Sequence, residues 1–187
     1  MPPQQAAYRI QPMPPGFLLG GFRCEPDGTD DEIGAYLADG TAANDQAVGF
    51  SRTYLVFDEA NQVVAYCSLL ADAIRLERGE ADEGWQYESA PCLKIARIGV
   101  RCDQRGRKIG SKLFDWIVLQ AIELGDRIGI RYITLDAVAS QIPWYRSLGF
   151  EFTTIAAQPS TEADKAAGDR SMLYDLGRPA DRAPSGD

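Results

Sequence analysis

The chain has 187 residues, of which 45% are hydrophobic and 25% are charged, a composition typical of one globular domain. Its net charge of -8 argues against general affinity for nucleic acid, and no apolar run approaches the roughly 18 residues of a membrane span. Histidine is absent, which excludes Ser–His and Cys–His catalytic pairs, histidine-ligated metals and the commonest general base.

The N-terminus and the cysteines both favour a cytoplasmic protein. Residues 1–5 lack the basic start and apolar stretch of a secretory signal, so we expect a cytoplasmic location and no membrane contact. The four cysteines are far apart and none forms a Cys-x-x-Cys pair. We therefore predict that they are small buried hydrophobes with no catalytic or metal-binding role. They are Cys24, Cys67, Cys92 and Cys102.

The first half of the chain predicts a weak helix and a strand hairpin. Residues 1–16 are rich in Pro and Gln, which predicts a loose lead-in to a single domain at 17–177. Apolar positions within 33–37 give a weak helical pattern. Residues 53–57 and 63–70, rich in β-branched and aromatic side chains and separated by a short polar segment, predict the two strands of a hairpin.

An acidic segment separates this hairpin from a strand and a long helix. Residues 77–89 contain five acids and no hydrophobic period, which predicts an exposed loop. Residues 92–100 predict a buried strand, and apolar residues recur at helical spacing over 109–124. The remaining segments predict a strand, a short helix ended by a left-handed glycine, two strands and a disordered tail. They are 130–135, 140–148 with Gly149, 150–155, 172–176 and 178–187.

Positive charge is concentrated between the predicted strand at 92–100 and the long helix. Residues 101–112 contain five basic side chains and one acid, a local charge of +4 in an acidic chain. Unpaired backbone N–H groups at the start of a helix would lie beside these side chains, and that combination binds anions. Gly106 permits a tight turn, and Gly110 has no side chain to block a phosphate. A solvated charged face is the alternative explanation of the same residues.

Two common phosphate-binding motifs do not fit this segment. Gly110 is followed by Ser111 and Lys112 in the reverse of the Walker order. No Gly-x-Gly-x-x-Gly fingerprint occurs anywhere in the chain. The sequence therefore predicts a phosphate site of another kind.

Arg105-Gly-Arg-Lys-Ile-Gly110, after a hydrophobic strand and before a helix, resembles the acetyl-CoA signature of the GNAT (Gcn5-related N-acetyltransferase) superfamily, Arg/Gln-x-x-Gly-x-Gly/Ala. Lys108 stands where the family usually has its first glycine. The family's downstream aromatic pair and Gly-Phe step are matched by Pro143-Trp-Tyr-Arg-Ser-Leu-Gly-Phe150. The resemblance covers residues 17–176. It implies an α/β (α+β) fold in which four helices flank a mixed, mostly antiparallel twisted sheet of six or seven strands.

The resemblance also implies roles for individual residues. Loop N–H groups would hold the pyrophosphate, the backbone of residues 98–100 would pair with the pantetheine arm, and Tyr145 would protonate the departing thiolate. Ser140 stands near a position where the family often has Asn. Asp136 and Glu88 are the candidate general bases, with a water chain as the alternative. The implied acetyl-CoA-binding residues are Ile98, Gly99, Val100, Arg105, Gly106, Arg107, Lys108, Ile109, Gly110, Ser111, Ser140 and Tyr145.

The function implied by the resemblance is metal-free transfer of an acetyl group from acetyl-CoA to a primary amine of a small molecule or peptide, by direct attack. The acidic loop at 77–89 would suit a cationic acceptor. Family members are often dimers, so the resemblance allows a homodimer without fixing the oligomeric state.

Two alternatives remain open. Phe22-Arg-Cys and Ser51-Arg-Thr-Tyr resemble the GNAT toxins of bacterial toxin–antitoxin pairs, which predicts an enzyme that acetylates aminoacyl-tRNA and is neutralised by an antitoxin protein. A non-catalytic acyl-CoA-binding module is the other alternative, favoured by the departures at Lys108 and Ser140.

Overall fold

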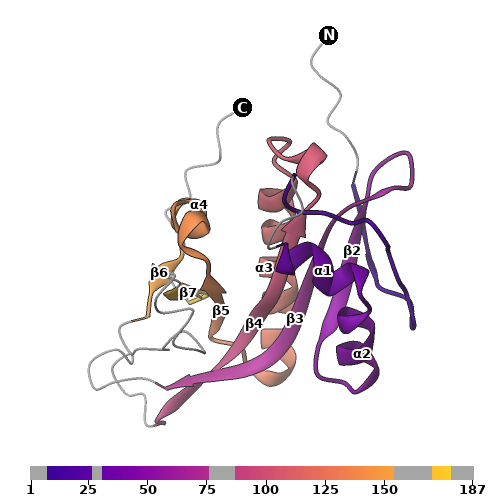
Figure 1. Ribbon diagram of the computed structural model, residues 1–187. Helices are drawn as coiled ribbons and strands as arrows, with labels where there is room; N and C mark the ends of the chain where they lie inside the picture. Colours follow the sequence, from indigo (N-terminus) through magenta and orange to yellow (C-terminus); the bar gives the residue numbers. More distant parts are fainter. Residues whose placement is uncertain (1–7, 27–30, 76–86, 154–169, 178–187) are drawn as a thin grey trace. The chain divides into compact units, whose positions relative to one another are not determined.

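The computed structural model describes residues 8–26, 31–75, 87–153 and 170–177 (Figure 1). The strands are β1 (Arg9–Pro12), β2 (Arg52–Phe57), β3 (Val63–Arg75), β4 (Ser89–Val100), β5 (Tyr132–Ala137), β6 (Glu151–Phe152) and β7 (Arg170–Asp175). The helices are α1 (Glu32–Ala38), α2 (Thr41–Ala47), α3 (Ile109–Ile128) and α4 (Ile142–Ser147), with short 3-10 turns η1 (Cys102–Gln104) and η2 (Ala139–Gln141). The strands form one sheet in the hydrogen-bonded order β1-β2-β3-β4-β5-β7-β6.

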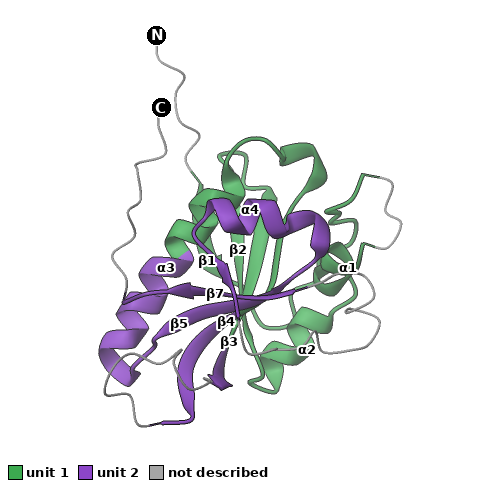
Figure 2. Ribbon diagram, turned by 90° about the vertical axis from the view of Figure 1, so that its left-hand side faces the viewer, with its two compact units in different colours: residues 1–70, 95–116 green, residues 71–94, 117–187 purple. Residues whose placement is uncertain are grey.

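The chain divides into two compact units (Figure 2). Unit 1 comprises residues 1–70 and 95–116, and unit 2 comprises residues 71–94 and 117–187. β3, β4 and α3 each continue from one unit into the other.

Unit 1 contains an antiparallel meander with two short helices. β1 pairs with β2, and β2 pairs with β3. The carboxylate of Asp31 caps α1 by accepting hydrogen bonds of 2.7 Å from the backbone N–H groups of Gly34 and Cys24. This cap orients α1 so that its apolar side chains reach a core shared with β2 and β3. Buried members of this core include Phe22, Tyr36, Leu37, Leu55 and Tyr66.

Unit 2 is organised around β5. This strand runs parallel to the first part of β4 and antiparallel to β7, which in turn pairs with β6. Ile133 and Leu135 point to one face of β5 because side chains alternate along a strand, and both are buried. Tyr174 of β7 lies opposite Ile133 in the ladder, and its ring contacts Phe150 with centroids 5.7 Å apart. This apolar face supports the chain that follows α4.

The structure confirms the predicted hairpin, long helix and central strands, although their ends move by several residues. The long helix continues to Ile128, and Gly149 has the predicted left-handed conformation with a φ of 97°. The predicted lead-in at 1–16 is wrong at β1, a four-residue strand stabilised by its pairing with β2. α2 was not predicted, because it has seven residues and no side-chain cap. Most of the predicted acidic loop at 77–89 and the whole tail at 178–187 lie outside the described residues.

Candidate active site

The ladder between β4 and β5 is short. It joins Cys92 to Tyr132 and ends where Lys94 lies opposite Thr134. In the described chain no β5 residue pairs with β4 residues 95–100. The backbone groups on this edge of β4 are therefore able to pair with an extended ligand, in the manner of an added strand.

Gly99 lies at a point of close packing on this part of β4. A Cβ atom built on it would lie 2.7 Å from Cys24 Sγ, 2.8 Å from Ile33 Cγ2 and 2.9 Å from Tyr66 Cε1. Real Cβ atoms do not approach other heavy atoms this closely, so the position requires glycine. Gly99 thus lets β4 pass against α1 and β3 in unit 1.

The turn between β4 and α3 leaves a series of backbone N–H groups without acceptors. Gly106 and Lys108 have left-handed φ values of 78° and 58°, which reverse the chain before α3. The N–H of Lys112 is the first in α3 to reach a carbonyl, at 3.1 Å from Lys108 O. Among the described residues no acceptor binds the N–H groups of residues 106–111. This is the geometry expected of an anion site at a helix N-terminus.

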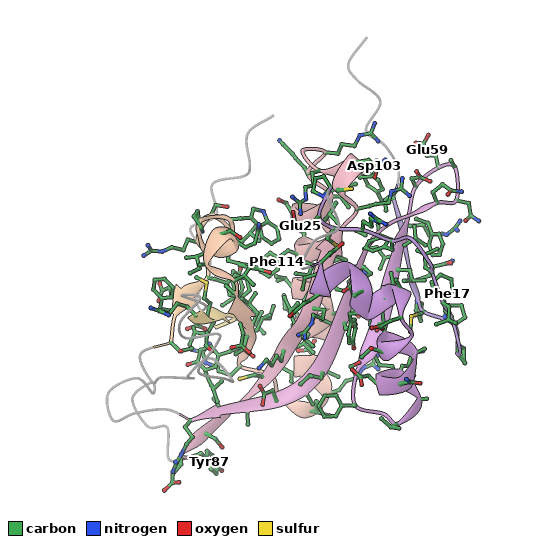
Figure 3. All side chains as sticks on the ribbon, in the orientation of Figure 1. Phe17, Glu25, Glu59, Tyr87, Asp103 and Phe114 are labelled. Carbon is green, nitrogen blue, oxygen red and sulfur yellow. The ribbon has the colours of Figure 1, made fainter. Side chains whose placement is uncertain are left out.

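The positive charge of the turn is divided between paired and unpaired side chains. Arg101 forms an ion pair with Asp103 at 2.6 Å, and Arg105 forms one with Glu25 at 2.7 Å. Glu25 and Asp103, which both belong to unit 1, are labelled in Figure 3. Hydrogen bonds from Arg101 hold the pKa of Asp103 below its usual range.

Three basic residues of the turn have no carboxylate partner in the described part of the chain. Arg107 donates to the Gln104 side chain at 2.7 Å, and Lys112 Nζ lies 5.3 Å from the centre of the Tyr8 ring. Lys108 is exposed. Arg107, Lys108 and Lys112 therefore supply the charge that is available to a phosphate.

Tyr145 is a buried side chain of α4 in unit 2. Its ring lies 4.8 Å from that of Trp144 and 5.6 Å from that of Phe150, measured between centroids. Burial raises the pKa of Tyr145 above its ordinary value of 10.0, so the phenol keeps its proton at neutral pH. This state suits a proton donor.

The two candidate bases have different surroundings within unit 2. Asp136 accepts a hydrogen bond from the Ser171 hydroxyl and lies 2.8 Å from Lys94 Nζ. The Glu88 side chain is 89% exposed and lies 3.6 Å from Arg75. Asp136 is therefore the more constrained of the two carboxylates, and the choice of a general base remains a prediction.

Sequence reasoning missed the partners of Asp136. Lys94 is the one charged side chain in the run Cys92-Leu-Lys-Ile-Ala, and that exception was a usable signal. Ser171 had no sequence signal, because it reaches Asp136 only through the pairing of β5 with β7. Ser140, at the position where Asn was expected by resemblance, is an exposed residue of η2.

The cysteines behave as predicted where they are buried. Burial raises the pKa of Cys24 to about 12 and that of Cys92 to about 11, and Cys67 is also buried with a raised pKa. Cys102 is half-buried. The described residues contain no group of His, Cys, Asp and Glu side chains arranged to hold a metal ion. They also include no helix long and apolar enough to cross a membrane.

Residues 49–152, more than half of the chain, match the profile of the acetyltransferase (GNAT) domain. The chain belongs to the GNAT acetyltransferase family. It is accordingly an acyl-CoA-dependent N-acetyltransferase with acetyl-CoA as cosubstrate, as predicted. The unbonded amides of residues 106–111 and the unpaired cations beside them fit the phosphates of that molecule.

Solved structures confirm the GNAT fold over nearly the whole chain. A bacterial toxin has a TM-score of 0.73 at 15% identity, covering 91% of this chain and 92% of its own. AtaT complexed with acetyl-methionyl-tRNAfMet has a TM-score of 0.71 at 14% identity, covering 90% and 95%. A tyrosine-to-phenylalanine variant of KacT has a TM-score of 0.73 at 15% identity, covering 92% and 96%.

Proposed function

We propose that this GNAT enzyme acetylates a primary amine of a small molecule or peptide in the cytoplasm, by direct attack of the amine on the thioester. The observation that carries the proposal is the run of unbonded N–H groups at residues 106–111, with unpaired cations beside it. The net charge of -8 favours a small or cationic acceptor over a polyanion.

Bound acetyl-CoA supplies an electrophilic thioester carbonyl and a thiolate leaving group. The N–H groups of residues 106–111 would hold its pyrophosphate, and the unpaired edge of β4 at Ile98 and Val100 would hold its extended arm. Ser140 would lie beside the cofactor, in the place of the family's usual Asn. A backbone N–H of β4 would bind the carbonyl oxygen as negative charge develops on it.

Protons must move in a definite order. The acceptor loses one proton to a base, for which Asp136 is the first candidate, before its nitrogen forms the new C–N bond. The C–S bond breaks, and Tyr145 gives its proton to the sulfur. The second proton lost by the nitrogen restores Tyr145 through solvent, so that only one proton is released overall. The buried, protonated phenol is suited to this step.

The second candidate acceptor is the α-amine of an aminoacyl-tRNA. It is favoured by structural similarity to AtaT and KacT across at least 90% of this chain. One AtaT structure contains acetyl-methionyl-tRNAfMet and another the C-terminus of the antitoxin AtaR. An enzyme of this type would require an antitoxin partner and a basic surface for tRNA, and the net charge of -8 counts against the latter.

A non-catalytic acyl-CoA-binding module has less support. Lys108 and Ser140 were the departures that favoured it. Lys108, however, takes a left-handed φ of 58°, a conformation that glycine adopts readily. The turn is therefore formed despite the substitution.

Transfer from radiolabelled acetyl-CoA to a panel of small amines, peptides and a total aminoacyl-tRNA pool tests the proposal directly. The expected result is a labelled small amine or peptide, with loss of label in Tyr145→Phe. Label on aminoacyl-tRNA, together with growth arrest on expression, would establish the second candidate instead. Retained acetyl-CoA binding with no labelled product on any acceptor would favour the binding module.

A further inference from the structure

A polar cluster occupies one face of the sheet in unit 2, at the end of the β4–β5 ladder. We call Asp72, Lys94, Asp136 and Ser171 the Lys94 cluster. Lys94 Nζ lies 2.8 Å from Asp136 Oδ2 and 4.0 Å from Asp72 Oδ2. The Ser171 hydroxyl donates to Asp136 Oδ1, so both oxygens of this carboxylate are held in place. Side chains from β3, β4, β5 and β7 thus converge on one polar group.

Thr134 adds a second, independent feature to this face. It lies opposite Lys94 in the β4–β5 ladder and two residues before Asp136 on β5, so strand alternation directs it to the side of the cluster. It is only 5% exposed, and its hydroxyl oxygen is the one buried side-chain polar atom without a hydrogen-bond partner in the described residues. A buried hydroxyl without a hydrogen-bond partner costs free energy. Thr134 Oγ1 therefore marks a position where a ligand can donate a hydrogen bond.

The opposite face of the same strands is apolar. Ile133 and Leu135 are buried there, on the side that carries Tyr174 and Phe150. The face that carries the Lys94 cluster has a small apolar core of its own, Ala90, Cys92 and Tyr132, next to Lys94 and Thr134 along the strands. Apolar side chains therefore supply the packing on both faces, and the convergence of the polar residues calls for another explanation.

The cluster retains an unbalanced charge. Two carboxylates surround one ammonium, which leaves one net negative charge. The side chains of Asp72, Lys94 and Asp136 are 37%, 30% and 33% exposed, so a solute can reach them while part of their hydration is removed. Partial desolvation strengthens the attraction between this charge and a cation.

We propose that the Lys94 cluster is the acceptor subsite of this enzyme, and that it binds an ammonium group of a cationic amine. The inference rests on the proposed function. Asp72 and Asp136 attract the ammonium, and its N–H groups donate to their oxygens and to Thr134 Oγ1. Lys94 and Ser171 are positioning residues, because they fix the Asp136 carboxylate without contacting the acceptor. The acceptor class is therefore a small amine or peptide that is positively charged at neutral pH.

The test is calorimetric titration of the full chain, saturated with CoA, with 1,4-diaminobutane, using 1,4-butanediol as the uncharged probe. The wild type should bind the diamine at least about tenfold more tightly than the diol. Asp136→Asn and Asp72→Asn should each weaken diamine binding about five- to tenfold, because each removes one negative charge. Asp126→Asn is the matched control, since it makes the same change at an exposed position of α3, and it should have no effect.

Lys94→Met separates recognition from a structural role. Removing this cation raises the net negative charge of the cluster, so diamine affinity should rise about threefold even if the melting temperature falls. A purely structural ion pair would lower stability and leave diamine affinity unchanged. If Asp136→Asn does not fold, the more exposed Asp72→Asn carries the test.

Acetyl-CoA titrations of the same samples separate a failure of the proposed function from a failure of the acceptor subsite alone. If the folded wild type does not bind acetyl-CoA, the proposed function itself is wrong. Normal acetyl-CoA binding, with diamine affinity unaffected by Asp72→Asn and Asp136→Asn, would overturn the subsite alone.

Discussion

Gly106 and Lys108, two residues apart in the turn before α3, share a left-handed backbone, with φ values of 78° and 58°. Glycine adopts this conformation without penalty, whereas a residue with a Cβ incurs roughly 1 kcal/mol. The glycine usual at the position of Lys108 in the GNAT signature is thus explained by backbone geometry. In this chain the turn keeps that geometry and gains a cation beside the proposed phosphate site.

Replacing Lys108 with glycine should stabilise the protein. Lys108→Gly removes the Cβ from a left-handed residue, so the free energy of unfolding should rise by about 0.5–1 kcal/mol. Urea unfolding measures the change. Lys108→Ala is the matched control, because it removes the same charge but keeps the Cβ, and it should give no such gain. Equal free energies of unfolding for Lys108→Gly and Lys108→Ala would show that the left-handed backbone of Lys108 is not strained.

The packing around Gly99 predicts a large cost for a single methyl group. Gly99→Ala would place Cβ within 2.7–2.9 Å of the side chains of Cys24, Ile33 and Tyr66. The free energy of unfolding should fall by about 1–3 kcal/mol, as is usual for overpacked cores. Gly20→Ala is a suitable control, since nothing lies within 4 Å of the Cβ built there. Similar melting temperatures for both variants would disprove the close packing.

Tyr145→Phe separates proton donation from packing. Phenylalanine keeps the ring contacts with Trp144 and Phe150 but removes the hydroxyl. The expected result is a fall in kcat of about a hundredfold, with the Kd for acetyl-CoA and the melting temperature unchanged. Steady-state kinetics on an acceptor found in the amine panel, paired with calorimetry, gives both quantities. An unchanged kcat would show that the Tyr145 hydroxyl is not the proton donor.

The raised pKa of Tyr145 also predicts the alkaline limit of activity. A general acid is lost only as pH rises through its own pKa, and burial places that pKa above the ordinary value of 10.0. The kcat of the wild type should therefore show no decline from Tyr145 between pH 7 and about 10. A decline of kcat in that range that disappears in Tyr145→Phe would show that the phenol ionises earlier.

Much of the candidate phosphate site in unit 1 was predictable, because the residues that indicate it are adjacent in the sequence. The strand, the basic turn and the helix are consecutive in the sequence, and the structure shows the turn at Gly106 and the free N–H groups before Lys112. The number of unpaired positive charges in the turn was not predictable. Glu25 neutralises Arg105 from 80 residues earlier, and only tertiary structure brings the two together.

Elements defined by pairing were harder to predict. β1 contains a proline and four residues, and it becomes a strand because β2 lies beside it. The Lys94 cluster is assembled from four strands that are distant in sequence, so Asp136 was singled out without its neighbours. Register, rather than local propensity, determines such sites.

Calorimetric titration of Gly110→Glu with acetyl-CoA shows whether the N–H groups of residues 106–111 bind the phosphates of that molecule. The new carboxylate would stand in the first turn of α3, where it repels phosphate. Leu119→Glu adds the same charge to a 58% exposed position of the same helix and is the control. We expect micromolar binding of acetyl-CoA by wild type and Leu119→Glu, and none by Gly110→Glu. Absence of binding by folded wild type, or equal binding by Gly110→Glu, would contradict this expectation.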